Sequence, residues 1–170
     1  MKVTIKLDTD WEIEAEIPDD VVDLLNKKKG RSAGYARVSE NEKYYFVDTK
    51  GCVGNIVDNR ATYDEDLFAI ANYYTSENLA ENNARADTLM RKLRRFAVAS
   101  RKNEFCRYNS NQEKFYIYYN CKDHKLGIDA NYIDHACGIT YFDSKESAQA
   151  AIDNFHDELI WYFTEYKDSI

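Results

Sequence analysis

The sequence predicts an α+β fold, in which an N-terminal ββα element is followed by two tandem βββα repeats whose helices pack on antiparallel sheets. Three observations support this prediction: strict apolar–polar alternation at the N-terminus, a nine-residue pattern that occurs twice, and an apolar stripe at helical spacing after each copy. Hydrophobic residues make up 44% of the 170 residues, and only one proline and six glycines interrupt the chain. This composition is sufficient for a packed core.

The N-terminal element is predicted to span residues 1–42 as a hairpin, a short helix and a linker. Apolar and polar residues alternate in residues 3–7 and again in residues 11–17, which predicts two strands with one apolar face each. The next segment, residues 18–29, begins with proline and aspartates and ends with three lysines before a glycine, as expected for a helix. Residues 30–42 are polar and are predicted to form the linker.

The rest of the chain contains one pattern twice. Residues 72–80 match residues 140–148 at a constant offset of 68, and in each copy an aromatic pair precedes a serine that can cap a helix. Further upstream, residues 44–47 correspond to residues 115–118 as aromatic-rich strands. The repetition predicts that equivalent segments adopt the same secondary structure.

Two repeat units are therefore predicted, at residues 43–105 (the first unit) and 106–170 (the second unit), and together they are expected to form one compact domain. Each is predicted to contain three strands and a long helix. These elements are expected at residues 43–48, 52–58, 66–74 and 76–100 in the first unit, and at residues 114–120, 125–130, 137–142 and 144–166 in the second. Each helix is expected to bury an apolar stripe. The stripes are Ala86, Leu89, Met90, Leu93, Phe96 and Ala97, and then Ala148, Ala151, Ile152, Phe155, Leu159, Tyr162 and Phe163.

The composition predicts a cytoplasmic protein. No run of about 18 apolar residues occurs, so no membrane span is expected, and the alternating N-terminus lacks the apolar stretch of a signal peptide. The four cysteines are irregularly spaced and are expected to be small buried residues or free thiols. The net charge of −7 disfavours nucleic acid as a partner and favours a basic one.

A family resemblance is carried by residues 71–77, 114–119 and 139–148. Through these segments the chain resembles, over about residues 43–167, a group of small uncharacterised proteins of phages and mobile elements in Gram-positive bacteria. The motifs are structural, so the resemblance implies an origin in a bacterial host and no active site. Accessory phage proteins of this size are often binders that block host functions, including CRISPR nucleases.

Two short motifs contain residue types that bind metals. Cys121 and His124 lie three positions apart, and His135 and Cys137 lie two apart. Thiolates and imidazoles suit tetrahedral zinc, but the single residue between His135 and Cys137 makes a poor chelate. Neither a metal nor another cofactor is expected. No nucleophile accompanies a base in a recognisable motif, so the chain is not expected to be an enzyme. The alternative to this prediction is a small metal-dependent enzyme at Cys121 and His124.

Charge is distributed unevenly along the two predicted long helices. Residues 85–102 carry seven Arg and Lys side chains against Asp87, a balance of +6, whereas residues 143–170 carry seven acids against two lysines, a balance of −5. The helices can be neighbours that complement each other, or the cations can favour a helix C-terminus. The functional alternative is a basic stripe that contacts phosphates or an acidic partner. This stripe consists of Arg91, Lys92, Arg94 and Arg95.

The second predicted strand carries an acidic face formed by Asp10, Glu12, Glu14 and Glu16. Alternate residues of a strand lie about 6.6–6.8 Å apart. This spacing is comparable to that of successive phosphates, so the face could mimic a nucleic-acid strand and occupy a basic channel. The alternative is an ordinary solvated face whose charges protect an exposed edge.

The resulting functional prediction is a non-enzymatic, acidic binding protein, in particular a phage-encoded inhibitor of a host defence nuclease that occupies a charged surface. The acidic face is slightly preferred as the contact because of the net charge of −7. The rival prediction is a phage accessory protein that binds nucleic acid through the basic stripe. The partner is thus expected to be a host protein, and the sequence predicts no particular oligomeric state.

Overall fold

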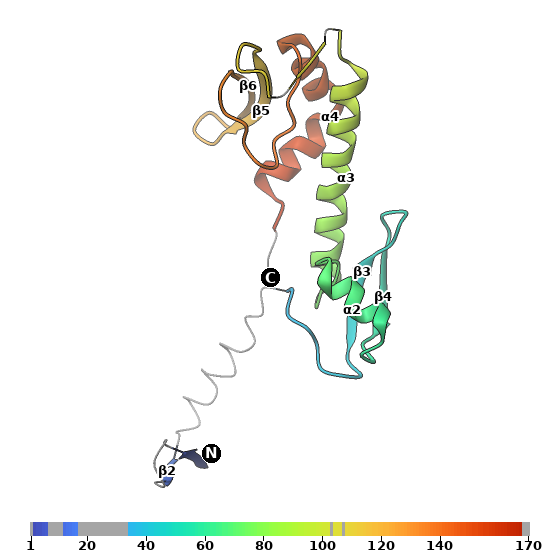
Figure 1. Ribbon diagram of the computed structural model, residues 1–170, viewed down its shortest axis with the longest axis vertical. Coiled ribbons are helices and arrows are strands. Elements are labelled where there is room, and N and C mark those ends of the chain that lie inside the picture. The colour runs from blue at the N-terminus through green and yellow to red at the C-terminus, as the bar shows by residue number, and fades with distance from the viewer. Residues whose placement is uncertain (1, 7–11, 17–33, 103, 107, 168–170) are drawn as a thin grey trace.

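The computed structural model in Figure 1 describes residues 34–102, 104–106 and 108–167 with their side chains, and the backbone of residues 2–6 and 12–16. The elements are β1 (Lys2–Lys6), β2 (Glu12–Glu16), β3 (Lys43–Val47), β4 (Val53–Val57), α2 (Thr62–Ala69), α3 (Glu77–Ala99), β5 (Lys114–Asn120), β6 (Lys125–Asn131) and α4 (Lys145–Thr164). Within these residues, β1–β2, β3–β4 and β5–β6 form three two-stranded antiparallel sheets. The predicted α+β class is therefore confirmed.

The N-terminal hairpin forms as predicted. In its register, Lys2 lies opposite Glu16 and Lys6 lies opposite Glu12. The helix predicted at residues 18–29 lies outside the described residues.

The repeated segments have matching structures. α3 begins at Glu77 and α4 at Lys145, which preserves the offset of 68, and the preceding residues Ser76 and Ser144 are both N-caps. Just upstream, each segment forms one isolated antiparallel bridge to the first strand of its unit. The prediction of equal secondary structure in residues 72–80 and 140–148 is thus confirmed, as are both hairpins and both long helices.

The third strand predicted in the first unit, at residues 66–74, is wrong. α2 occupies its first part, and only Tyr74 pairs, exchanging two backbone hydrogen bonds of 2.8 Å with Tyr45. Asp64 explains the helix: its Oδ2 accepts a hydrogen bond from the Ala61 N–H at 3.0 Å, which satisfies a donor at the helix start.

The third strand predicted in the second unit, at residues 137–142, is also wrong. Only Phe142 pairs, exchanging backbone hydrogen bonds of 3.1 and 2.8 Å with Phe115. Gly138 has a φ of +80°, a left-handed conformation that interrupts an extended strand. Each unit therefore contains a hairpin with a single bridging residue at its edge and a long helix after it, and the first unit adds α2 between the hairpin and the bridging residue.

The two bridges also correct the alignment of the first strands. They make Tyr45 equivalent to Phe115, an offset of 70, whereas the sequence suggested that Tyr44 corresponds to Phe115. A shift of one residue exchanges the two faces of a strand. The residue equivalent to Tyr44 is consequently Lys114, and both side chains are buried.

α3 connects the two units (Figure 1). It has 23 residues, which corresponds to a length of about 34 Å at 1.5 Å per residue. Its first half places Leu79 and Ala80 in a cluster with Tyr74, and its second half places Leu89 and Leu93 in the main core with α4. α4 in turn packs on β5 and β6.

Both apolar stripes face the core, but their membership differs from the prediction, since Leu79, Ala80 and Ala84 of α3 are also buried. Phe163 belongs to the predicted stripe of α4 and is 39% exposed, whereas Trp161 lies outside that stripe and is buried. Among the helices in the described ranges, none has the length and apolar character needed to cross a membrane.

Candidate binding surfaces

The acidic face lies partly in the described backbone. Glu12, Glu14 and Glu16 belong to β2, whereas Asp10 lies outside the described residues. Residues directly opposite in an antiparallel pair share a face of the sheet. The face with the three glutamates therefore also carries Lys2 and Lys6 of β1, and its formal charge falls from −3 to −1.

The metal-ligand residue types lie in turns and loops of the second unit. Cys121 and His124 lie in the turn between β5 and β6, and His135 and Cys137 lie in the loop after β6. Throughout the described residues, no group of three or more Cys, His, Asp or Glu side chains is arranged to hold a metal. All four cysteines are free and exposed, so of the two predicted alternatives the free thiols are confirmed and the small buried residues are wrong.

Two cations of α3 face α4. Lys92 Nζ lies 3.9 Å from Glu158 Oε1, and the Arg85 guanidinium lies 3.8 Å from the centre of the Trp161 ring. Arg85 and Lys92 are seven residues apart and therefore lie on the same side of the helix. The two charged helices are therefore neighbours, and one ion pair, Lys92–Glu158, joins their opposite charges, whereas Arg85 stacks on an aromatic ring. Lys92 therefore contacts α4 and does not belong with the other exposed cations of the predicted basic stripe.

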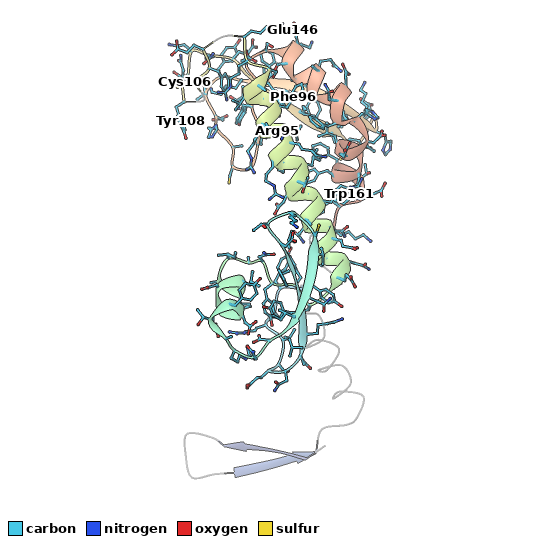
Figure 2. The ribbon with its side chains drawn as sticks, turned by 90° about the vertical axis from the view of Figure 1, so that its right-hand side faces the viewer. Arg95, Phe96, Cys106, Tyr108, Glu146 and Trp161 are labelled. Atoms are coloured by element: carbon cyan, nitrogen blue, oxygen red, sulfur yellow. The ribbon has the colours of Figure 1, made fainter. Side chains whose placement is uncertain are left out.

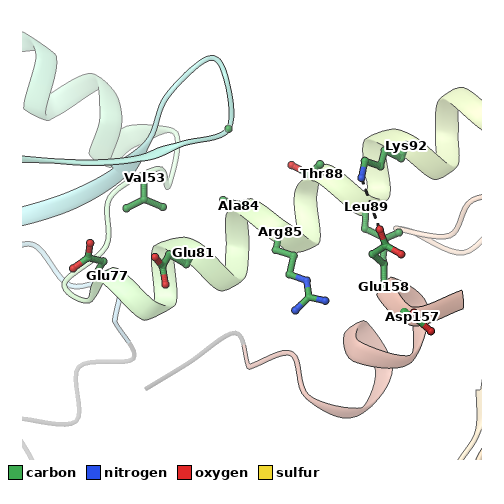
Figure 3. Close-up of a pocket in the computed structure, with 11 residues that line it drawn as sticks. Val53, Glu77, Glu81, Ala84, Arg85, Thr88, Leu89, Lys92, Asp157 and Glu158 are labelled. Carbon is green, nitrogen blue, oxygen red and sulfur yellow. Dashed lines mark ion pairs between the residues drawn. The ribbon is translucent and has the colours of Figure 1, made fainter. Parts of the chain in front are cut away.

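A cavity of about 560 Å³ lies along this side of α3 (Figure 3). Both charge signs line it: Glu77 and Glu81 from the first turns of α3, Arg85 and Lys92 further along, and Asp157 and Glu158 from α4. The lining holds four carboxylates and two cations, a formal charge of −2, so the cavity does not favour an anionic ligand.

The other three residues of the stripe point to solvent. Arg91, Arg94 and Arg95 are exposed and stand at helical positions i, i+3 and i+4, which lie on one side of α3. Arg91 donates a hydrogen bond to Thr88 Oγ1 at 3.2 Å. Within the described part of the chain, none of the three forms an ion pair. We call Arg91, Arg94 and Arg95 the basic face.

The adjacent residue shows how sharply α3 is divided. Phe96 packs edge-to-face on Phe155 of α4, with ring centres 5.7 Å apart, whereas its neighbour Arg95 is exposed (Figure 2). The apolar side of α3 thus faces the core, and the basic face lies on the solvent side.

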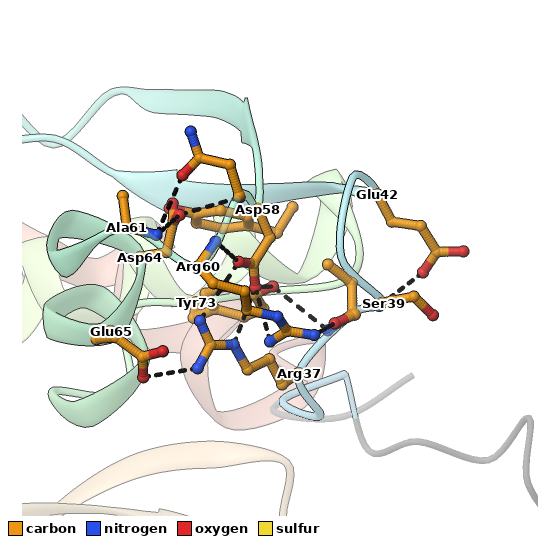
Figure 4. Close-up of polar contacts among 12 residues, drawn as sticks. Arg37, Ser39, Glu42, Asp58, Arg60, Ala61, Asp64, Glu65 and Tyr73 are labelled. Carbon is orange, nitrogen blue, oxygen red and sulfur yellow. Dashed lines mark hydrogen bonds and ion pairs between the residues drawn. The ribbon is translucent and has the colours of Figure 1, made fainter.

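A buried polar network in the first unit was not predicted from the sequence (Figure 4). Asp58, which is fully buried, accepts hydrogen bonds from Arg37 Nε at 2.9 Å, from Tyr73 Oη at 2.8 Å and from the Arg60 N–H at 2.9 Å. Arg37 Nη1 also forms an ion pair with Glu65 at 2.6 Å. The network thereby ties a segment of the predicted linker to the end of β4 and to α2.

A second buried carboxylate lies beside the first. Asp64 accepts hydrogen bonds from Tyr44 Oη at 2.7 Å and from the backbone N–H groups of Asn59 and Ala61 at 3.1 and 3.0 Å. The rings of Tyr44 and Tyr73 stack with their centres 3.9 Å apart. Buried carboxylates are tolerated when their oxygens are hydrogen-bonded in this way.

Burial and hydrogen bonding shift the pKa values of three groups in the network. The hydrogen bond from Arg37 holds the pKa of Asp58 well below its usual range, against the opposing effect of burial. Burial and the bond to Asp58 raise the pKa of Tyr73 to about 12, and burial and the bond to Asp64 raise that of Tyr44 further. A carboxylate has about four acceptor sites, and those of Asp58 are already used. The network therefore ties these segments together, and the Asp58 carboxylate has no acceptor site left.

Two adjoining cavities lie in the second unit beside the loop at residues 137–140. The smaller, of about 400 Å³, is bounded by β5, α3 and α4 and is mostly apolar. The larger, of about 830 Å³, shares Met90, Tyr162 and residues 137–140 with it and adds two cations, Arg94 and Arg101, and one acid, Asp87. An apolar pocket thus lies next to a basic one that includes a residue of the basic face.

No protein-family model, curated protein or solved structure matches this chain.

Proposed function

We propose that the protein is a non-enzymatic binding protein that uses the basic face of α3 to occupy an acidic surface of another protein. The observation that carries this proposal is the exposure of Arg91, Arg94 and Arg95 together, without an ion pair among the described residues. The remaining cations of α3, Arg85 and Lys92, lie against α4. Unpaired charges of one sign steer association with a partner of the opposite sign.

The register of the N-terminal hairpin favours the basic face over the acidic one. Lys2 and Lys6 lie opposite Glu16 and Glu12, so β1 offsets much of the charge of β2. Opposite charges in such cross-strand positions stabilise a sheet.

A protein partner is favoured over nucleic acid because the chain carries a net charge of −7. A nucleic acid would experience this overall repulsion along its whole length. An acidic segment of a protein can be short enough to meet the basic face alone.

The resemblance to phage proteins supports a more specific version of this role. The partner would be a protein of a bacterial cytoplasm, such as a nucleic-acid-binding defence nuclease, and the chain would inhibit it by covering a functional surface. An effect on nuclease activity at stoichiometric concentrations would support this version.

The proposal is tested by capturing partners from bacterial lysate with the full-length protein and measuring the affinity of the purified partner at low and high salt. Replacing Arg91, Arg94 and Arg95 by glutamine should weaken binding about tenfold or more, chiefly through a slower association rate. The matched control replaces Glu12, Glu14 and Glu16 by lysine and should bind at least as well as the wild type.

The opposite pattern, with binding lost only in the lysine variant, would make the acidic face the contact. If the captured ligand is instead DNA or RNA, with an affinity that falls steeply with salt, the protein is a nucleic-acid-binding protein and the proposal is wrong.

A further inference from the structure

The edge of β5 that faces the bridge is open for most of its length. At one end, the Phe115 N–H and C=O groups bond to Phe142. Backbone groups of alternate residues in an antiparallel strand point to the same edge, so those of Ile117 and Tyr119 point the same way as those of Phe115. Among the described residues, no hydrogen bond reaches the N–H or C=O group of Ile117 or Tyr119 on this edge.

The first unit closes the same edge with one side chain. Val47 is the equivalent of Ile117, since the bridges set the offset at 70. Asn72 Oδ1 accepts a hydrogen bond from the Val47 N–H, and Asn72 Nδ2 donates one to the Val47 C=O, both at 2.8 Å. The amide of Asn72 therefore imitates one residue of a neighbouring strand.

The second unit lacks this closure. Thr140 stands where Asn72 stands in the first unit, at the offset of 68. A threonine side chain has a single hydroxyl and cannot satisfy both an N–H and a C=O in this way. In the described part of the chain, no hydrogen bond joins Thr140 to Ile117.

The open edge borders the two cavities of the second unit. Ile117 and Thr140 both line the apolar cavity of about 400 Å³, together with Leu93, Leu159 and Phe163. The adjoining cavity of about 830 Å³ is lined by Arg94 and Arg101 against the single carboxylate of Asp87, and Arg101 Nε is buried without a hydrogen-bond partner among the described residues.

We propose that the open edge of β5 binds an extended segment of the acidic partner protein by β-strand addition. The segment bonds to the backbone of Ile117 and Tyr119, its inward apolar side chains enter the smaller cavity, and an acidic side chain meets Arg94 and Arg101. This inference rests on the proposed function, because it names the part of the partner that the basic face attracts.

The chemistry of the site defines the partner segment. In strand addition, main-chain hydrogen bonds supply affinity, and pockets for alternate side chains supply specificity. The segment should therefore alternate apolar and acidic residues over about five to seven positions, as strand periodicity requires. The arginines would repel a basic segment, and a uniformly polar segment would have no side chain to fill the apolar cavity.

A suitable probe is a blocked peptide with the sequence of residues 11–17, Trp-Glu-Ile-Glu-Ala-Glu-Ile, which alternates in the required way. Amide hydrogen exchange of the full-length protein is measured with and without the peptide. In the free protein, the Ile117 amide should exchange at least tenfold faster than the Val47 amide, which Asn72 protects. The peptide should slow exchange at Ile117 and Tyr119 at least tenfold and leave Val47 unchanged.

Two exchanged variants test the edge itself. Thr140→Asn should close the edge as Asn72 does, slow the Ile117 amide in the free protein and weaken peptide binding at least tenfold. The reciprocal variant, Asn72→Thr, should leave peptide binding to the second unit unchanged and speed exchange at Val47. An Ile117 amide already protected in the free wild type would overturn the proposal, and so would equal peptide affinity of wild type and Thr140→Asn.

The basic-face variant separates the two proposals. The first outcome is that glutamine at Arg91, Arg94 and Arg95 does not alter the affinity of the captured partner, while the peptide protects Ile117 in the wild-type protein. In that case the proposed function fails and the strand-addition site stands. If the captured partner depends on the basic face but the peptide leaves Ile117 unprotected, the strand-addition site fails alone.

Discussion

The first and second units share the same order of hairpin, bridging residue and long helix, and they differ in what packs on the hairpin. In both, a hairpin, one bridging residue and a serine N-cap lead into a long helix. In the first unit, α2 covers the second face of the hairpin, and Tyr44 and Tyr73 are almost completely buried there. In the second unit a loop lies after β6 instead, and Tyr118 remains 39% exposed.

The same contrast applies to polar groups. The position of Tyr44, whose hydroxyl bonds to a buried carboxylate, is taken in the second unit by Lys114, which donates to the backbone carbonyl of Tyr132. The edge that Asn72 closes is open beside Thr140. The difference indicates that the first unit is built for stability, whereas the second keeps unfilled hydrogen-bonding and packing capacity, which is what a binding site requires.

The largest difference should follow from removing the buried carboxylate of the first unit. Asp58→Ala leaves Arg37 and Tyr73 without their buried partner, and breaking such a pair costs about 3–5 kcal/mol. Asp129→Ala in β6 is the matched control, because Asp129 is exposed, and it should change the free energy of unfolding by no more than about 0.5 kcal/mol. Urea unfolding of both variants measures the contrast. Equal effects would show that the two units are equally sensitive.

The second comparison uses two tyrosines at equivalent positions. Tyr73 Oη donates to Asp58 and accepts from the Val38 N–H, whereas Tyr141 Oη accepts from the Ala136 N–H at 2.9 Å. Tyr73→Phe leaves a buried charged acceptor short of a donor and should cost about 1–3 kcal/mol. Tyr141→Phe affects one backbone N–H in an exposed loop and should cost less than about 1 kcal/mol. A larger effect for Tyr141→Phe in chemical unfolding would reverse the assignment of the stable unit.

The raised pKa of Tyr73 predicts a dependence of stability on alkaline pH. Its pKa is about 12 in the folded protein, because of burial and the bond to Asp58, and about 10 in an unfolded chain. A raised folded-state pKa contributes stability below the unfolded value, which is lost as pH rises from about 10 to about 12. The free energy of unfolding should therefore fall across this window, and less steeply in Tyr73→Phe. An identical slope in both proteins would contradict the role of Tyr73.

The frame of each unit could be predicted because its signals are local. The hairpins follow from alternation, and α3 and α4 follow from long apolar stripes and from serines repeated at an offset of 68. The register of the first strands could not be predicted, because both strands are aromatic at successive positions and a one-residue shift leaves the pattern nearly unchanged. Only the bridges from Tyr74 and Phe142 fix the alignment.

The network and α2 depend on partners that are distant in sequence. Asp58 bonds to Arg37, 21 residues away, and Asp64 bonds to Tyr44, 20 residues away. Aspartates are rarely buried unless they are paired, so the local sequence around Asp58 and Asp64 carries no signal of their burial or of α2. One signal of the open edge was present in the sequence: the repeat aligns Asn72 with Thr140, and the loss of an amide at that position could have been noticed.

The smallest predicted effect favours the second unit, because its long helix has a side-chain hydrogen bond at the N-cap and the long helix of the first unit has none. Ser144 Oγ accepts a hydrogen bond from the Ser147 N–H at 3.1 Å, whereas the equivalent Ser76 makes no side-chain cap bond. Ser144→Ala should therefore cost about 1 kcal/mol of stability, and Ser76→Ala should cost only a few tenths, within the range of neutral surface changes. Thermal or urea unfolding of the two variants decides the point. Equal losses would mean that the two serines cap their helices alike in solution. The expected asymmetry would show that the first unit is stabilised mainly at its hairpin and the second at the start of its helix.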